Sequence, residues 1–312
     1  MTNILITSGG KRVDLIKEFK SVLGNRGQVI ITDFDLHNAG KFFADRFYLA
    51  PKISDKRYIL FLKDVIAKHD IKLLFSVIDP ELPLLSKNKQ ALETTGCKVL
   101  ISTMRSVRIA HDKAKTAAFF QKIGVKTPHI IPFGGNIKFP AFVKPRQGSG
   151  SKFAYKVNSK KELEVYKGIV PKPLLFEYIS GQEYTIDALN DFEGNIINVI
   201  PRKRIEVANG VSIKAEVDMD PAIIEDCFKI LRNMKIFGPS TIQCIKSPSG
   251  NYFIELNLRF GGGAMLGIKS GGNYAAKILG LMQGKKYPLE IRRVKNGYRM
   301  AAYIDHKFEQ HD

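Results

Sequence analysis

Ser240-Thr-Ile-Gln-Cys-Ile-Lys-Ser-Pro-Ser-Gly-Asn-Tyr-Phe-Ile-Glu-Leu-Asn-Leu258 contains two alternating stretches, 240–246 and 252–258, on either side of a turn sequence. Proline, serine, glycine and asparagine favour turns, so the segment predicts a β-hairpin. Successive side chains of a strand point to opposite faces. One face of the second strand should therefore carry Glu255, Asn257 and Arg259, and the opposite, buried face Ile254, Leu256 and Leu258.

The polar face of this hairpin is a candidate metal site. A five-residue loop over 247–251 would place Lys246 opposite Tyr252 and Gln243 opposite Glu255. Directly opposed Cβ atoms lie about 5 Å apart. Gln243, Glu255 and Asn257 would then present three oxygen ligands, the kind that Mg²⁺ prefers, and leave room for phosphates. An ordinary hairpin with a polar outer face would show the same pattern.

Besides the hairpin, two glycine-rich segments are candidates for phosphate binding. Leu258-Arg-Phe-Gly-Gly-Gly263 follows it directly, and glycines let backbone amides approach phosphates. Upstream, Lys144 ends a predicted strand, Ala141–Lys144, beside the Gly/Ser loop Gly148–Ser151. A lysine is a point charge suited to phosphate. Taken singly, Lys144 could be a solvated strand-end lysine, and the loop a hairpin turn.

The first third of the chain alternates predicted strands and helices. We expect strands at 4–7, 29–33, 73–77 and 98–102, with helices from about Val13, over 58–68 and over 82–94. Such alternation predicts a parallel sheet with covered faces. Residues 1–105 should therefore form a Rossmann-like α/β domain.

The rest of the chain predicts α+β structure with antiparallel sheets. Helices are expected over 112–123, from Ser159 and over 221–235, with strands at 141–144, 174–177, 182–189 and 196–200 besides the hairpin. We divide this part into residues 106–178, which carry the glycine-rich loop, and residues 179–312, which carry the candidate metal site.

Together these residues resemble the ATP-grasp family over nearly the whole chain. The order matches: Asp112-Lys113 opening a helix, Lys144, the glycine loop, Glu177-Tyr-Ile179, Glu183, Gln243, Glu255, Asn257 and Arg259. Residues 1–105 resemble the family's N-terminal domain, including Asp33, Ala44–Tyr48 and Asp79-Pro-Glu81. Within the family, the chain resembles one synthetase unit of the carbamoyl-phosphate synthase large subunit. Leu258 departs from the proline that many members have, and a single unit without a glutaminase argues against carbamoyl phosphate synthesis itself.

The resemblance implies an ADP-forming carboxylate–amine ligase that uses ATP with Mg²⁺ or Mn²⁺ and passes through an acyl phosphate. Lys113 and Lys144 would hold the phosphates under the loop Gly148, Ser149, Gly150 and Ser151. The backbone of Glu177, Tyr178 and Ile179 would read adenine, and Glu183 the ribose. The metal ligands would be Gln243, Glu255 and Asn257. The residues that steady the transferring phosphate would be Arg259, Arg204 and Lys214.

The acceptor substrate should bind to the N-terminal domain, because open α/β sheets bind ligands beyond the carboxyl ends of their strands. Lys11 or Arg12 could pair with a substrate carboxylate, and Asp79 or Glu81 with an ammonium group. A plain turn with solvated side chains is the alternative. The expected partners are thus small carboxylate and amine molecules, with a homo-oligomer left open.

Other classes of protein fit less well. Gly262–Ser270 interrupts a Walker A pattern with Ile268, since that loop needs Gly-Lys-Ser contiguous. Gly9-Gly10 lacks the G-x-G-x-x-G spacing of a Rossmann cofactor site. A non-catalytic ATP sensor on the same fold stays open.

Composition supports a cytoplasmic protein without a membrane span. The start lacks a basic signal-peptide region, no apolar run approaches about 18 residues, and the three cysteines have no metal-ligand spacing. The net charge is +19, and residues 106–178 carry 14 Lys/Arg against 4 Asp/Glu. No aromatic residues interleave with the basic ones, so we do not expect nucleic acid as a partner.

Overall fold

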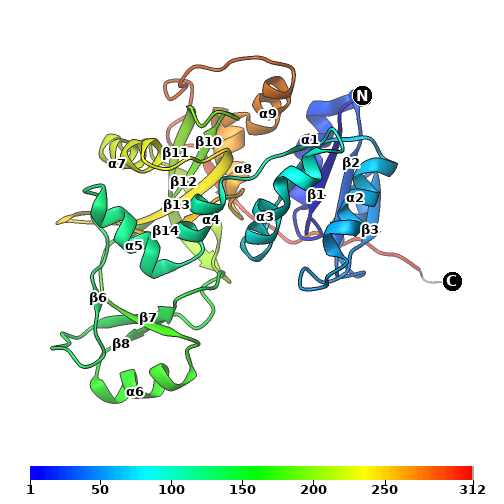
Figure 1. Ribbon diagram of the computed structural model, residues 1–312. Coiled ribbons are helices and arrows are strands. Elements are labelled where there is room, and N and C mark those ends of the chain that lie inside the picture. Colours follow the sequence, from blue (N-terminus) through cyan, green and yellow to red (C-terminus); the bar gives the residue numbers. More distant parts are fainter. Residues whose placement is uncertain (311–312) are drawn as a thin grey trace.

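The computed structural model describes residues 1–310, which build three sheets (Figure 1). The first is entirely parallel, in the order β3-β2-β1-β4-β5. Its strands are β1 (Asn3–Thr7), β2 (Val29–Asp33), β3 (Arg46–Leu49), β4 (Ile71–Ser76) and β5 (Lys98–Val99). The sequence prediction of a Rossmann-like sheet is confirmed. Strand β3 has no counterpart among the predicted elements, because its four residues lie at a partly exposed edge and carry little hydrophobic signal.

Helices connect the parallel strands as predicted. They are α1 (Val13–Leu23), α2 (Tyr58–Lys68) and α3 (Leu82–Glu93), with short 3₁₀ turns η1 (Gly24–Arg26), η2 (Ala39–Phe42) and η3 (Asp79–Glu81). Helix α1 buries Leu15, Ile16, Phe19 and Leu23, the stripe that a 3.6-residue period produces. Turn η3 directly follows β4, so it lies at the carboxyl edge of the sheet.

The second sheet is antiparallel and has the order β14-β13-β10-β11-β12-β15. Its strands are β10 (Gln182–Asn190), β11 (Ile196–Ala208), β12 (Val211–Val217), β13 (Gly238–Ser247), β14 (Gly250–Asn257) and β15 (Arg299–Ala301). The helical elements attached to it are α4 (Met104–Ala110), α5 (Lys113–Lys122), α7 (Pro221–Arg232), α8 (Ala264–Gly267), the π-helical turn η4 (Ile268–Gly272) and α9 (Tyr274–Met282).

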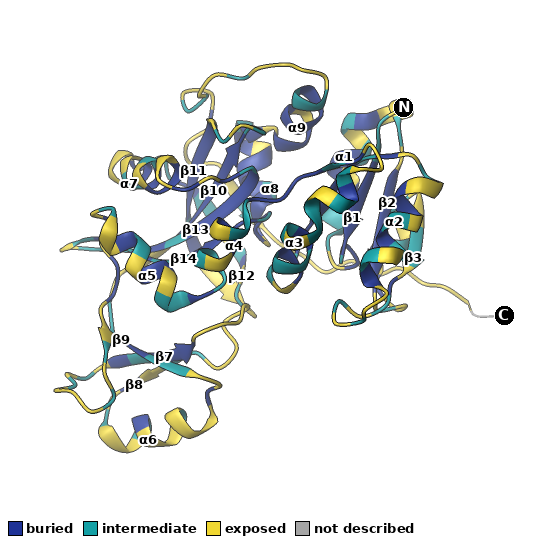
Figure 2. Ribbon diagram, viewed as in Figure 1, coloured by how far each residue is buried: buried dark blue, intermediate teal, exposed yellow. Residues whose placement is uncertain are grey.

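The third sheet is small and antiparallel, in the order β6-β9-β7-β8. It consists of β6 (Ile130–Ile131), β7 (Ala141–Pro145), β8 (Tyr155–Val157) and β9 (Pro173–Glu177), with helix α6 (Lys160–Ile169) on its outer side, where most residues are exposed (Figure 2). Its apolar core, from Ala141 to Leu175, is separate from the others. Helices α4 and α5 pack against β14 instead, so this separate unit begins near residue 130 and not at 106.

The hairpin β13–β14 differs from its predicted pairing. Its turn is only Pro248-Ser249, so Lys246 pairs with Asn251 and not with Tyr252. A bulge at Ile254 then restores the predicted pairing of Gln243 with Glu255. The bulge also makes Phe253 the fully buried residue of this stretch, while Ile254 is half-buried and not in the core as expected. An extra residue in one strand re-aims the side chains that follow it, and here it keeps Glu255 on the polar face.

The parallel sheet and the large antiparallel sheet share a hydrophobic core. One cluster joins Ile4, Phe19 and Phe75 of the first sheet's layer to Phe260 and Tyr274 from the far end of the chain. The segment after β15 returns to the N-terminal unit, where Lys41 forms an ion pair with Glu309. Cys97, Cys227 and Cys244 are buried and unpaired, as expected. In the part of the chain that the structure describes, no helix is long and apolar enough to cross a membrane.

Candidate active site

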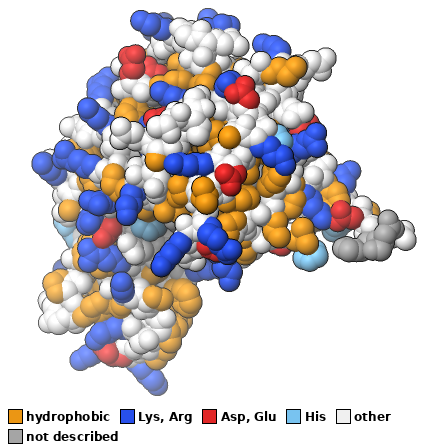
Figure 3. Space-filling model, turned by 45° about the vertical axis from the view of Figure 1, so that its right-hand side comes forward, with side chains coloured by type: hydrophobic (Ala, Val, Ile, Leu, Met, Phe, Trp, Pro, Cys, Tyr) orange, Lys and Arg blue, Asp and Glu red, His pale blue; other side chains and the backbone are white. Residues whose placement is uncertain are grey.

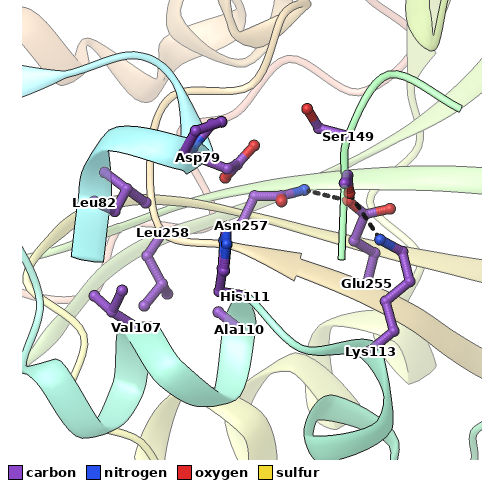
Figure 4. Close-up of a pocket in the computed structure, with 12 residues that line it drawn as sticks. Asp79, Leu82, Val107, Ala110, His111, Lys113, Ser149, Glu255, Asn257 and Leu258 are labelled. Atoms are coloured by element: carbon purple, nitrogen blue, oxygen red, sulfur yellow. Dashed lines mark hydrogen bonds between the residues drawn. The ribbon is translucent and has the colours of Figure 1, made fainter. Parts of the chain in front are cut away.

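A cavity lies where three distant segments meet: the end of β14, the loop after β7 and the turn η3 after β4 (Figure 4). Helix α4, with Val107 and Ala110, and Lys113 at the start of α5 close its lower side. Its polar lining residues come from all of these segments: Asp79, His111, Lys113, Ser149, Glu255 and Asn257. The structure therefore brings Lys113, Ser149, Glu255 and Asn257, all predicted as binding residues, to one cavity, whereas His111 was not among the predicted residues.

The floor beside this cavity is a row of polar side chains across four strands. Strand register places Glu255 opposite Gln243, Gln243 opposite Thr185, and Thr185 opposite Arg202. The other face of β10 carries Tyr184, Ile186 and Ala188 in the core. Alternation along each strand thus divides the large sheet into a packed face and a polar face.

The candidate metal ligands lie together on this polar face. Asn257 is 7% exposed, and its amide Nδ2 donates to Glu255 Oε1 at 3.2 Å. Gln243 is directly opposite Glu255, as the sequence predicted. Within residues 1–310, no three His, Cys, Asp or Glu side chains form a group that could hold a metal. A metal here would depend on amide oxygens plus the single carboxylate of Glu255.

Lys144 is a buried cation at the end of β7. Its side chain reaches across to the large sheet, where Nζ donates to the carbonyl of Ile254 at 3.4 Å, and it lies over the ring of Phe176 at 4.5 Å. Burial lowers the pKa of Lys144 to about 8, although the Glu255 carboxylate opposes that shift. A buried ammonium without a full counter-charge is costly, so this arrangement favours an incoming anion.

The glycine-rich loop is fastened at its start to helix α5. Lys113 Nζ donates to the Gly148 carbonyl at 2.8 Å, and the Arg146 side chain donates to Asp112, the N-cap of α5, at 2.8 Å. Gly148 and Gly150 have φ angles of 131° and 69°, a region that glycine enters without strain. At Gly150 the loop touches the β11–β12 turn, where a Cβ on Gly210 would come within 2.8 Å of the Gly150 backbone.

The segment Glu177–Ile179 connects the small sheet to β10, the place the resemblance gives to adenine. The Glu177 amide donates to the His129 carbonyl at 3.0 Å, and the Glu177 carboxylate accepts from the His129 amide at 2.9 Å. Tyr178 lies under the ammonium of Lys156 at 4.4 Å. The side chain and amide of Glu177 are thus engaged within the protein.

Glu183 and the two additional basic residues have partners of their own. Arg204 is buried, lies 3.2 Å from Glu183 Oε2 and donates to the Gly210 carbonyl at 3.1 Å. It therefore links the expected ribose ligand to the turn that touches the glycine loop. Lys214 is 57% exposed and pairs with Glu206 at 2.7 Å. Lys214 lies outside the cavity lining, and its expected contact with phosphate stays a prediction.

The expected acceptor-binding residues separate into different environments. Glu81 is completely buried and accepts hydrogen bonds from Ser8, Tyr58 and Ser76. It was expected to pair with a substrate ammonium, but its burial makes it unavailable to one. Burial raises its pKa. Lys11 is exposed, away from the cavity lining.

Arg12 and Asp79 do reach the junction between the two large units. Arg12 pairs with Asp14 at 3.2 Å and donates to the Phe260 carbonyl at 3.5 Å. Asp79 lines the cavity, where it accepts from Arg259.

The sequence reasoning missed one buried ion pair beneath the glycine run 261–263. Arg202 Nε donates to Asp187 at 2.8 Å, and both side chains are at most 2% exposed. A Cβ on Gly263 would come within 3.0 Å of the Arg202 guanidinium. The signal was present, because Glu183, Thr185 and Asp187 alternate with apolar residues and thus share the polar face of β10.

Comparison with known proteins supports the fold that this geometry defines. Residues 4–100 match the family described as PylC-like, N-terminal domain, and residues 170–305 match ATP-grasp in the biosynthetic pathway with Ter operon. The L-amino acid ligase from Bacillus licheniformis superimposes with a TM-score of 0.70 at 18% identity, over 91% of this chain and 74% of that one. A biotin carboxylase complex from Campylobacter jejuni gives 0.72 at 17% identity, over 96% and 74%. At such identities the superpositions establish the fold.

Curated relatives are similar in sequence over part of the chain. The 3-methyl-D-ornithine–L-lysine ligase of Methanosarcina mazei is 28% identical over 54% of this chain and 43% of its own length. The D-alanine–D-alanine ligase of Fusobacterium nucleatum is 28% identical over 55% and 64%. A carbamoyl-phosphate synthase of Methanobrevibacter smithii is 27% identical over 67% and 62%. The chain thus spans less than two thirds of the length of each of these relatives.

These findings give the chain an ATP-grasp domain over residues 170–305, and the relatives it matches include ligases and a carbamoyl-phosphate synthase, as the sequence resemblance indicated. More particularly, the ATP-grasp domain follows a PylC-like N-terminal domain.

Proposed function

We propose that this protein is an ATP-dependent ligase that joins a carboxylate to an amine through an acyl phosphate, releasing ADP and phosphate. The observation that carries the proposal is the convergence of Lys144, Lys113 and the glycine loop on the polar end of β14, where Glu255 and Asn257 lie. Cations, loop amides and oxygen ligands around one cavity are what phosphoryl transfer requires.

Mg²⁺ fits the residues present. Glu255 forms no ion pair and the Gln243 side chain forms no hydrogen bond within the described chain, so their oxygens are available to a cation. With Asn257, they would hold metal and leave its other positions to phosphate oxygens. A bound metal would neutralise phosphate charge.

The protein's own groups would then position the reactants. Lys144 and Lys113 would hold the ATP phosphates, with residues 148–151 excluding water above them. The substrate carboxylate attacks the γ-phosphorus, which forms the acyl phosphate and expels ADP. The amine attacks the acyl carbon, loses a proton, and phosphate leaves with the C–O bond electrons. Arg259 would balance charge on the transferring group, and Arg204 would hold Glu183 for the ribose.

A screen of acid and amine pairs tests this proposal. Each pair is incubated with ATP and Mg²⁺, and ADP, AMP and phosphate are separated by chromatography. A ligase gives ADP and phosphate in equal amounts only when both substrates are present. AMP as the stoichiometric product would remove the acyl-phosphate mechanism. The rival ATP sensor would bind ATP in calorimetry and release no ADP with any pair.

A further inference from the structure

Arg259 is held by a carboxylate from the other end of the chain. Its Nε donates to Asp79 Oδ2 at 2.9 Å, and Nη2 contacts the same oxygen. The two residues are 180 positions apart, one directly after β14 and the other in turn η3 of the N-terminal unit. Their side chains are 15% and 14% exposed. This is therefore a shielded contact between two units of the fold, of a kind that solvent weakens far less than an exposed pair.

The contact fixes the orientation of the guanidinium. Arg259 Nη1 donates to the Phe260 carbonyl at 3.0 Å, so Nε, Nη1 and Nη2 each have a partner. A guanidinium has five N–H donors in a rigid plane. Three donors hold the plane in place, and two remain for oxygens of a bound group.

The backbone around Arg259 is also fixed. The next residue, Phe260, is 1% exposed and packs its ring against Phe75 at 5.4 Å and Phe19 at 6.1 Å, both in the N-terminal unit. Asp79 therefore completes a rigid mount for Arg259, two positions after the candidate ligand Asn257. Figure 4 shows Asp79 at the same cavity as Asn257 and Glu255.

We propose that Asp79 is a positioning residue, which orients Arg259 toward the phosphate that the cavity receives. The inference rests on the proposed function for the identity of that phosphate, the γ-phosphate of ATP. It assigns Asp79 a role different from direct recognition of a substrate ammonium. Through Asp79, the position of the N-terminal unit determines where the positive charge of Arg259 lies relative to the candidate metal ligands on β14.

The experiment compares Asp79→Asn, Arg259→Met and the double variant. Asparagine keeps the shape of the side chain and removes its charge. We expect Asp79→Asn to lower kcat by about 10-fold or more, because small misplacements of such groups cost up to ~10²-fold. The KM of the amine should not change. In the Arg259→Met background, Asp79→Asn should have no further effect, the signature of two groups acting as one.

Direct nucleotide binding provides a second readout. Calorimetry with Mg²⁺ and either ATP or ADP should show that Asp79→Asn reduces the preference for ATP, because the misplaced guanidinium faces the γ-phosphate. This measurement needs no substrate pair. Lost ATP preference without any ADP release in wild type would support the positioning role and refute the proposed ligase.

A control and two opposing outcomes complete the design. Asp55→Asn breaks the local pair with Arg57 at 2.7 Å in the same unit and should leave kcat and ATP preference unchanged. A raised amine KM that persists in the Arg259→Met background would show that Asp79 binds the substrate directly. A lower thermal midpoint with unchanged kcat and ATP preference would reduce Asp79 to a structural link. If Asp79→Asn does not fold, Asp79→Glu supplies the same measurements with the charge kept but displaced.

Discussion

Replacing Lys144 by methionine should raise the free energy of unfolding while it weakens the binding of Mg-ATP. Lys144 is 9% exposed, and burial lowers its pKa from the ordinary 10.5 to about 8. Each pKa unit corresponds to about 1.36 kcal/mol, so holding the charged form in the folded state costs about 3 kcal/mol. The contact with the Phe176 ring returns roughly 1 kcal/mol. Methionine has a similar length and no charge, and the net gain should be about 2 kcal/mol at pH 7, or roughly 3 °C in the thermal midpoint.

The pH dependence gives this prediction its signature. Below pH 8, Lys144 is charged in both the folded and the unfolded states, and wild type carries the full cost. Between about pH 8 and 10.5 the folded state releases the proton while the unfolded state keeps it, so wild-type stability rises with pH. The advantage of Lys144→Met should therefore be constant below pH 8 and shrink above it.

Urea unfolding at pH 7 and pH 9.5 measures the effect. Lys115→Met, at an exposed position of α5, is the matched control and should change stability little at either pH. Mg-ATP should raise the midpoint of wild type more than that of Lys144→Met. A Lys144→Met variant less stable than wild type at pH 7, or an advantage that is equal at both pH values, would refute the reasoning.

Three further predictions concern the ligands, the loop and the buried pair. Glu255→Gln should lower turnover by about 10²-fold or more at an unchanged thermal midpoint, because it removes the single full charge among the candidate ligands; ordinary ADP release would contradict that role. Mg-ATP should protect residues 148–151 from limited proteolysis, and equal cleavage with and without nucleotide would count against loop closure. Arg202→Met should cost about 3–5 kcal/mol in urea unfolding, since it leaves Asp187 buried without a counter-charge; the exposed Arg57→Met is the control, and wild-type stability would show that Asp187 is compensated elsewhere.

Much of the fold was predictable because local patterns determine it. The alternation along 240–258 gave a hairpin with Gln243 opposite Glu255, and the strand–helix alternation before residue 100 gave a parallel sheet. The predicted five-residue loop was wrong, yet the bulge at Ile254 offset the shorter turn. Strands β6, β8 and β15, of two or three residues each, escaped prediction, and so did two longer strands, β3 and β12. Strand β3 is short and lies at an edge, whereas β12, Val211–Val217, alternates apolar and polar residues and so carried a strand signal that the prediction overlooked.

Long-range contacts explain what the sequence could not show about the site. Asp79 and Glu81 look equivalent in the sequence, but one faces the cavity and the other is buried among hydroxyl groups. The sequence around Arg259 does not indicate that its partner is Asp79, because no local pattern encodes a contact between residues 180 positions apart. The roles proposed for these residues in binding and catalysis stay predictions.

The packing of Phe260 between Phe19 and Phe75 determines which part of the molecule can move. Strand β14, which carries the candidate metal ligands, is joined to the N-terminal unit through a shared core, so these two parts form one packed body. The small sheet has its own core and is joined to the rest by the chain before β6 and the chain after β9, and by contacts of its glycine-rich loop and Lys144 with α5 and β14 (Figure 1). We expect it to be the part that moves. Its helix α6 carries Lys160, Lys161 and Lys167, and Figure 3 shows Lys and Arg side chains scattered among hydrophobic and acidic ones over the face that it draws. We therefore expect closure over a nucleotide to move the small sheet alone and to leave the distance between Asp79 and the candidate ligands Glu255 and Asn257 unchanged.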